Sequence, residues 1–124
     1  MKHDPLADVF SVIKNMEDIG RRQALVPATK LAHDVLTLMK EHGYIGDFPT
    51  KGSKLQVELK GKVNNCRVIR PRFSVQKGKF IKWEKRFLPA NTLGILILTT
   101  TKGVMDHRKA KQEGLGGQLI GFVY

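Results

Sequence analysis

The chain has 124 residues, enough for one ordinary domain or two small lobes. Hydrophobic residues make up 41% of it, a share that supports a packed core and argues against intrinsic disorder. Lysine and arginine number 22 against 11 aspartate and glutamate, and the net charge of +11 points to a polyanionic partner. No apolar run is long enough to cross a bilayer, and the single cysteine, Cys66, excludes an intramolecular disulfide.

The first half of the chain alternates helical and strand patterns. Apolar residues recur at helical spacing between Pro5 and Gly20, and the side chain of Asp4 can cap this helix. Thr29 can cap a second amphipathic helix, which Gly43 ends. Short apolar or alternating runs predict strands at Gln23–Pro27, Tyr44–Phe48 and Leu55–Lys60, with a turn at Lys51–Lys54.

The second half is richer in strand patterns. Strands are predicted at Val63–Ile69, at Gly94–Leu98, which is apolar enough to be buried, and at Gln118–Tyr124. Asp106 can cap a short polar helix that ends at Glu113. The segment Phe80–Phe87 fits either a helical turn or irregular structure.

These elements predict an α/β (α+β) fold with two small lobes. The N-terminal lobe, residues 1–62, is predicted to contain helix, strand, helix, strand and strand in that order. The C-terminal lobe, residues 63–124, is mainly β with one short helix. The charge balance changes at the same boundary, because the first lobe has a net charge of +2 and the second a net charge of +9.

The excess positive charge is concentrated in one stretch. Arg67 to Arg86 contains eight basic residues and one acid, Glu84, interleaved with four aromatic residues. A stripe of this kind binds phosphates with counterion release, so nucleic acid is favoured over a merely solvated face. The aromatic side chains can stack on unpaired bases or anchor the segment to the core, and their large apolar area favours the core.

Catalytic and metal-binding patterns are not found. The four histidines lack metal-ligand spacing, and Cys66 on a predicted strand is better explained as a small core residue than as a reactive thiol. The glycines at residues 114–117 precede a strand and not a helix, so they are not a dinucleotide fingerprint. We therefore expect no enzyme, no metal, no cofactor and no small-molecule substrate.

A run of three threonines, Thr99, Thr100 and Thr101, stands at the end of the apolar strand. Hydroxyls donate and accept hydrogen bonds and the methyls give apolar contacts, which suits an unpaired base or the sugar and phosphate beside it. A strand edge rich in β-branched residues explains the run equally well.

Several short segments, spread over essentially the whole chain, together form a recognisable pattern. They are Asp4–Asp8, Ile13–Asn15, Val26–Lys30, Gly43–Ile45, Gly94–Met105, Gly114–Gly117 and Gly121–Tyr124. In this order and spacing they resemble the small-subunit ribosomal protein family numbered eight. The middle stretch, Lys82–Ala90, is similar to the archaeal and eukaryotic branch of that family.

The resemblance implies a two-lobed protein that binds directly to an irregular stem in the central domain of small-subunit ribosomal RNA and helps the subunit to assemble. In the family the C-terminal lobe reads that stem through a Ser-Thr-Ser loop. Thr99, Thr100 and Thr101 stand at the corresponding positions here. Gln118 replaces a frequent acid, keeping an acceptor without the charge, and Lys30 is the best-matched position for an RNA-backbone contact by the N-terminal lobe.

The remaining predicted contacts combine this resemblance with residue chemistry. Lys102 suits a phosphate, and the neighbouring glycines permit close backbone approach or positive φ. Arg70 and Arg72, on either side of Pro71, suit phosphate, sugar or neighbouring ribosomal proteins. The full set predicted to bind RNA is Thr99, Thr100, Thr101, Lys102, Gly103, Gly116, Gly117, Gln118, Lys30, Arg70 and Arg72.

Several functions compete with a ribosomal one. The chain can be a general RNA- or DNA-binding module outside the ribosome, or a repressor that binds its own messenger RNA, as some family members do. A small enzyme or a protein-only interaction module is disfavoured by the sparse acids and by the charge of the second lobe. The expected partners are small-subunit ribosomal RNA and neighbouring small-subunit proteins, with no membrane. The sequence after Met1 lacks an apolar signal core, so we expect a cytoplasmic location.

Overall fold

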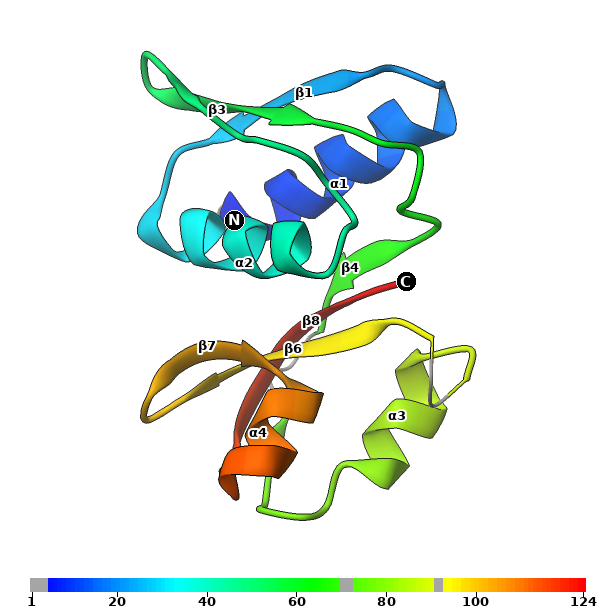
Figure 1. Ribbon diagram of the computed structural model, residues 1–124, viewed down its shortest axis with the longest axis vertical. Coiled ribbons are helices and arrows are strands. Elements are labelled where there is room, and N and C mark those ends of the chain that lie inside the picture. Colours follow the sequence, from blue (N-terminus) through cyan, green and yellow to red (C-terminus); the bar gives the residue numbers. More distant parts are fainter. Residues whose placement is uncertain (1–4, 70–72, 91–92) are drawn as a thin grey trace, which may run out of the picture. The chain divides into compact units, whose positions relative to one another are not determined.

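The chain divides into two units, residues 1–66 and 67–124, and the computed structural model describes residues 5–69, 73–90 and 93–124 (Figure 1). The contacts place the division after Cys66, whereas the charge pattern placed it after residue 62. In chain order the elements are α1 (Pro5–Asp18), β1 (Gln23–Pro27), α2 (Lys30–Glu41), β2 (Thr50–Lys51), β3 (Lys54–Glu58), β4 (Cys66–Val68), β5 (Ser74–Val75), α3 (Ile81–Phe87), β6 (Ile95–Thr100), β7 (Gly103–Asp106), α4 (His107–Glu113) and β8 (Gly117–Val123).

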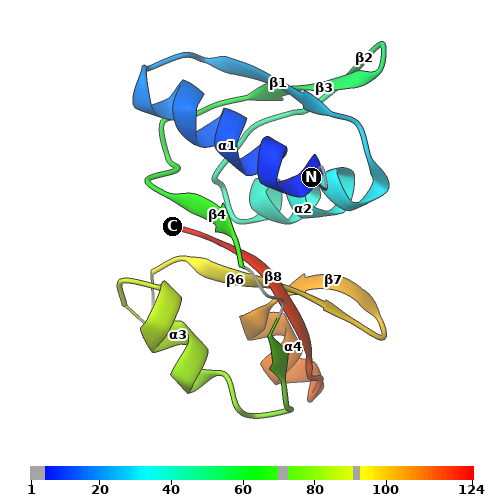
Figure 2. The same ribbon diagram turned by 180° about the vertical axis from the view of Figure 1, so that it is seen from behind.

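Unit 1 is a three-stranded antiparallel sheet with both of its helices on one side, as the view from behind also shows (Figure 2). The strand order is β1-β3-β2. Ala24 and Val26 of β1, and Leu55 and Val57 of β3, are buried and alternate with more exposed residues. The alternation that predicted these two strands therefore directs one face of the sheet onto the apolar faces of α1 and α2.

The second helix begins and ends where its capping residues predict. Thr29 has extended backbone, and its hydroxyl oxygen accepts a hydrogen bond from the Ala32 N–H at 3.1 Å. Gly43, with φ of +79°, follows the last turn in the left-handed conformation that glycine adopts without strain. Lys30 consequently lies at the first helical position of α2, exposed to solvent.

The segment Tyr44–Phe48 is not a strand, contrary to the prediction. It runs beside β3, but its hydrogen bonds are irregular. The Gly46 N–H donates to the Glu58 carbonyl at 2.8 Å, and the Glu58 N–H donates to the carbonyl of Asp47 at 2.9 Å. The strand after α2 is instead Thr50–Lys51, which forms a tight hairpin with β3.

Unit 2 is built on a sheet in the order β4-β8-β6-β7, with the short β5 also pairing with β8. The apolar stretch Ile95–Leu98 is buried within β6, as predicted, and β8 lies where the final strand was expected. In contrast, β4 covers only three of the residues predicted as Val63–Ile69. The strand Gly103–Asp106 was not predicted, and it forms a hairpin with β6.

Two short helices, not one, accompany the strands that the structure describes in unit 2. The segment Phe80–Phe87 contains the helix α3, and α4 is capped at its start by Asp106, whose carboxylate accepts from the N–H groups of Arg108 and Lys109. The α+β class and the mainly β character of this unit are confirmed. Its buried cluster contains Ile69, Val75, Phe80, Trp83, Leu88, Leu96, Leu98, Met105, Ala110, Leu119 and Phe122. Within the described ranges, no helix has the length and hydropathy to span a bilayer.

Candidate nucleic-acid interface

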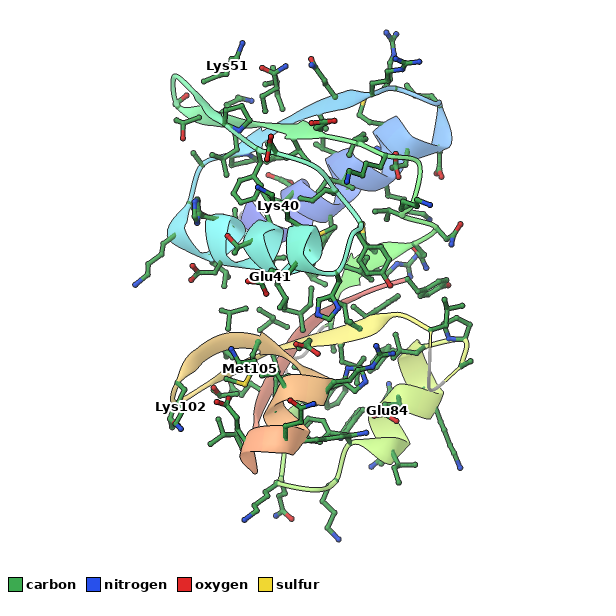
Figure 3. The ribbon with its side chains drawn as sticks, in the orientation of Figure 1. Lys40, Glu41, Lys51, Glu84, Lys102 and Met105 are labelled. Atoms are coloured by element: carbon green, nitrogen blue, oxygen red, sulfur yellow. The ribbon has the colours of Figure 1, made fainter. Side chains whose placement is uncertain are left out.

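The predicted threonine run lies at the end of the β6–β7 hairpin. Thr99 and Thr100 are the last residues of β6, while Thr101 and Lys102 form the turn and Gly103 opens β7. Figure 3 shows Lys102 at the tip of this hairpin. Thr101, Lys102 and Gly103 are exposed, and the two strand threonines are partly buried. The hairpin therefore presents hydroxyl and ammonium groups together at one tip.

The hydroxyl of Thr100 holds this turn together. Its Oγ1 donates to the carbonyl of Gly103 at 2.9 Å and accepts from the N–H of Lys102 at 3.1 Å. A hydroxyl has one proton and two lone pairs, so only one acceptor position remains for another molecule. Thr100 is consequently a support of the turn first, and Thr101 is the more accessible hydroxyl.

A polar row crosses the sheet at the same end. Ser74 pairs with Gln118, and Gln118 pairs with Thr99, so these three side chains share one face across β5, β8 and β6. Ser74 and Gln118 are exposed and Thr99 is partly so. Ser74 was missed by the sequence reasoning, because its partner lies 44 residues away. The short alternation Phe73-Ser74-Val75-Gln76 was the available local signal.

A register shift in the β6–β8 pairing creates this row. Ile97 pairs with Gly121, but the next residue, Leu98, pairs with Leu119, so Ile120 has no residue opposite. Without this bulge, Thr99 would lie opposite Leu119 and not Gln118. Because a one-residue slip exchanges the two faces of a strand, the bulge keeps Leu119 in the core and places Gln118 beside Thr99.

Gly116 and Gly117 allow backbone atoms of neighbouring strands to approach them closely. A Cβ on Gly116 would stand 2.5 Å from the carbonyl oxygen of Val75, and one on Gly117 would collide with the carbonyl oxygen of Thr99. Neither glycine has positive φ, whereas Gly103 has φ of +110° with open space around it. The first two glycines thus allow strands to approach closely, and the third forms the turn.

A dense basic surface lies on and beside α3. Lys79, Lys82, Lys85 and Arg86 are all exposed. The Arg86 guanidinium stands 5.0 to 5.8 Å from the ring centroids of the aromatic residues beneath it, and the Lys82 ammonium stands 4.9 Å from that of Trp83. These cations are held over apolar rings and keep their charge at the surface.

The aromatic residues of the basic stripe belong to the core side. Trp83 is 8% exposed and stacks on Phe73 with ring centroids 4.7 Å apart, and Phe80 is fully buried. Phe87 extends the stack toward Phe122. The anchoring interpretation is confirmed for Phe80 and Trp83, whose rings are buried and do not lie open for base stacking. The rings beneath the cations of α3 are those of Phe73, Trp83 and Phe87.

A buried polar cluster joins α3 to α4. The Glu84 carboxylate forms an ion pair with the Lys111 ammonium and lies 3.3 Å from His107 Nε2, without hydrogen-bond alignment to the imidazole (Figure 3). His107 Nδ1 accepts a hydrogen bond from the Leu96 N–H at 3.0 Å. Burial lowers the pKa of His107 from its usual 6.5, so the ring is neutral and acts as an acceptor.

Within the described ranges, the candidate metal ligands lie apart from one another and the cysteine is buried. There, no three histidine, cysteine or acidic side chains are grouped as metal ligands. The Cys66 thiol is buried and donates to the carbonyl of Phe10 at 3.3 Å, and burial raises its pKa to about 12. A thiol with that pKa is a poor nucleophile, which agrees with its predicted core role.

Not all predicted contact residues lie in one place. The residues from Thr99 to Gly103, with Gly116, Gly117 and Gln118, gather at the β6–β7 end of unit 2. Lys30 belongs to unit 1. Arg70 and Arg72 lie outside the residues that the structure describes.

Comparison with known proteins places this chain in a family. The model of the family "Ribosomal protein S8" matches residues 4–124. The chain is 48% identical over 126 residues to the small ribosomal subunit protein uS8 of Methanococcoides burtonii, covering 98% of this chain and 97% of the relative. It is 43% identical to the uS8 protein of Picrophilus torridus, over the full length of both.

These relatives are archaeal, as the middle stretch of the sequence indicated, and they are ribosomal structural proteins and not enzymes. Family members bind small-subunit ribosomal RNA and neighbouring ribosomal proteins. A match over almost the entire chain, with the polar hairpin and basic helix in one unit, leads to one conclusion: the chain belongs to the ribosomal protein S8 family, as a structural constituent of the small ribosomal subunit.

Proposed function

We propose that the β6–β7 end of unit 2 reads an irregular stem in the central domain of small-subunit ribosomal RNA. The observation that carries this proposal is the row Ser74, Gln118 and Thr99 beside the exposed turn at Thr101 and Lys102. Hydroxyls and an amide recognise base edges and the 2′-hydroxyls of a distorted helix, where a regular duplex hides its bases. Binding there helps the subunit to assemble.

The basic surface of α3 supplies attraction without sequence preference. Its exposed cations neutralise phosphates on either side of the stem and release counterions. Arg70 and Arg72 add phosphate contacts in the same half of the chain, and Lys30 contacts RNA backbone from unit 1. This division assigns affinity to the cations and recognition to the hairpin, with residues 63–124 as the RNA-reading lobe and residues 1–62 as a supporting lobe.

Two other functions would use the same surface, and the first of them makes a different prediction. A general RNA- or DNA-binding module would bind the stem and a regular duplex alike. A repressor of its own messenger RNA would use the same hairpin on a stem of similar shape, and nothing in the chain favours this over the ribosomal stem.

A protein that works in the small subunit acts in the cytoplasm, where the ribosome translates.

The proposal is tested by binding to the central-domain stem and to a regular duplex of equal length across a salt series. Thr99→Val and Thr101→Val remove hydroxyls without changing shape, and each is expected to reduce the preference for the stem by about five- to tenfold. Both variants keep their cations, so the salt slope is expected to stay unchanged.

Thr100 needs a separate control because its hydroxyl closes the turn. Thr100→Ser keeps that hydroxyl and removes the methyl, so it is expected to retain the preference. Equal binding of the native chain to stem and duplex would show a charge-driven binder and refute the proposal. Loss of binding to both RNAs in the threonine variants would contradict the division of labour.

A further inference from the structure

Unit 2 buries the carboxylate of Glu84 between α3 and α4. The residue is only 5% exposed, and a carboxylate removed from water is stable where a positive charge and hydrogen bonds replace that water. Two side chains of α4 stand at its Oε1 atom. The Lys111 ammonium forms an ion pair with this oxygen, and His107 Nε2 lies 3.3 Å from it. One oxygen atom therefore faces two groups that can each carry a positive charge.

The hydrogen bond on the other side of the imidazole decides which of the two groups is charged. Nδ1 of His107 accepts from the Leu96 N–H of β6 at 3.0 Å, so Nδ1 has no proton and the neutral ring carries its proton on Nε2. A second proton would have to go to Nδ1, where it would face the N–H of Leu96. The ring is therefore neutral while this bond exists, and Lys111 supplies the positive charge.

The other charged groups that face the ring are held by partners of their own. The Asp106 carboxylate accepts from two N–H groups at the start of α4, and the Arg108 guanidinium donates to the carbonyl of Gly94 at 3.3 Å. These contacts do not involve the imidazole. The charge balance at the ring therefore depends on the pair formed by Glu84 and Lys111.

The two members of this pair act on the imidazole in opposite directions. Burial lowers the pKa of His107 most, Glu84 raises it, and Lys111 lowers it again. The Lys111 side chain is 39% exposed, whereas the imidazole is 1% exposed. Loss of the Lys111 charge would leave the buried carboxylate with His107 as the basic group that remains at 3.3 Å.

We propose that His107 is the reserve counter-ion of Glu84, and that Lys111, by holding the charge in its place, keeps α4 joined to β6. When the charge moves to the ring, Nδ1 becomes a donor and the bond from the Leu96 N–H is lost. Lys111 is thus a positioning residue that acts through Glu84 and His107 on β6, the strand that leads into the threonine run. This inference goes beyond RNA recognition and does not rest on it.

Titration of the histidine signals by NMR in the full chain tests this transfer of charge. Lys111→Gln removes the charge and keeps a group that can donate to Glu84. It is expected to raise the pKa of His107 by about 1 to 3 pH units, and an unchanged pKa would refute the proposal. His107→Asn identifies the His107 signals among those of the four histidines.

A second lysine of the same helix is the matched control. Lys109 is exposed two residues before Lys111, and Lys109→Gln removes the same charge. This variant is expected to leave the pKa of His107 at its native value, as is Lys111→Arg, which keeps the charge beside the carboxylate. An equal rise in Lys109→Gln and Lys111→Gln would attribute the effect to net charge and contradict the proposal.

Glu84→Gln removes the carboxylate with little change of shape and decides the question should Lys111→Gln not fold. Because Glu84 raises the pKa of His107, the pKa is expected to fall below its native value, and a native value would refute the proposal. In Lys111→Gln/Glu84→Gln, burial still acts on the ring without the carboxylate, so the pKa is expected to lie below 6.5. A higher pKa would show that another group charges the ring.

Hydrogen exchange follows the joint between α4 and β6 at the Leu96 N–H. At one pH unit below the His107 pKa of Lys111→Gln, this amide is expected to exchange about tenfold faster in the variant than in the native chain. The other amides of β6 are the internal control, and equal acceleration along the strand would overturn a specific change at the joint. These measurements use no RNA, so this proposal and the stem proposal fail by separate experiments.

Discussion

The carbonyl oxygen of Thr99 occupies the place where a Cβ on Gly117 would stand. That oxygen belongs to the backbone of β6, which is fixed by its partners on both sides, so it cannot turn away as a side chain would. Gly103 is different, since its surroundings are open and only its φ of +110° requires glycine. Glycines that look equivalent in the sequence therefore have different physical reasons.

This difference predicts that alanine at the two positions lowers the free energy of unfolding by unequal amounts. Gly117→Ala is expected to lower the free energy of unfolding by about 2–3 kcal/mol, because β6 and β8 must separate to admit the methyl. Gly103→Ala is expected to cost about 1 kcal/mol, from backbone strain alone. Urea unfolding of both variants measures the two values. Equal costs would show that β8 yields easily and that the close approach is not a constraint.

At the scale of elements, His107 ties α4 to β6. The hydrogen bond from the Leu96 N–H to Nδ1 exists only while that nitrogen carries no proton. Glu84, Lys111, Arg108 and Asp106 surround the ring with charges of both signs, and burial is the largest cause of its lowered pKa. The strand and the helix are thus joined by a contact that acid breaks.

The sign of the pH effect follows from this lowered pKa. Below pH 6.5, His107 is protonated in the unfolded chain but stays neutral in the folded chain. The free energy of unfolding is therefore highest above pH 6.5 and falls as the pH drops toward the pKa of the folded state. His107→Asn keeps an acceptor near Nδ1 and cannot titrate. The loss of unfolding free energy between pH 7 and pH 5, measured by urea titration, is expected to shrink in this variant.

How well the sequence predicts these elements depends on where each one finds its partners. The strand predicted at Leu55–Lys60 forms at Lys54–Glu58, because alternation is a local signal of a half-buried strand but does not fix its last residue. Phe80–Phe87 stayed undecided because its inward face includes the buried acid Glu84, which interrupts the apolar pattern of a helix. The polar row depends on the pairing of β5 with β8 and on a bulge at Ile120. Neither the pairing nor the bulge can be predicted from a short stretch of sequence.

At the scale of the whole molecule, charge is distributed unevenly along the chain. Residues 63–124 have a net charge of +9, and their cations outnumber any local acids that could neutralise them. Electrostatic attraction of this kind reaches any nucleic acid and weakens with salt. In our proposal the residues of the β6–β7 hairpin add preference for the stem but little long-range attraction.

Removing surface cations is therefore expected to act alike on all RNAs. Lys79→Gln/Lys85→Gln is expected to weaken binding to stem and duplex by the same factor, and to reduce the slope of log K against log salt by about one per lost phosphate contact. Lys51→Gln/Lys54→Gln, on the exposed hairpin of unit 1, is the matched control for lost charge. A change in the preference for the stem would assign sequence recognition to α3.

The central place of β8 in its sheet has a consequence for the order of events during synthesis. The strands of unit 1 all lie between residues 23 and 58, so that sheet is complete early in translation. In unit 2, β4 and β5 pair only with residues 117–123 among the described strands, and β6, which already pairs with β7, gains its second neighbour from the same residues. A nascent chain can therefore carry a finished first unit while the polar row does not yet exist. The RNA recognition that we propose for this row therefore requires that the strand shared by the hairpin and β5 has been translated.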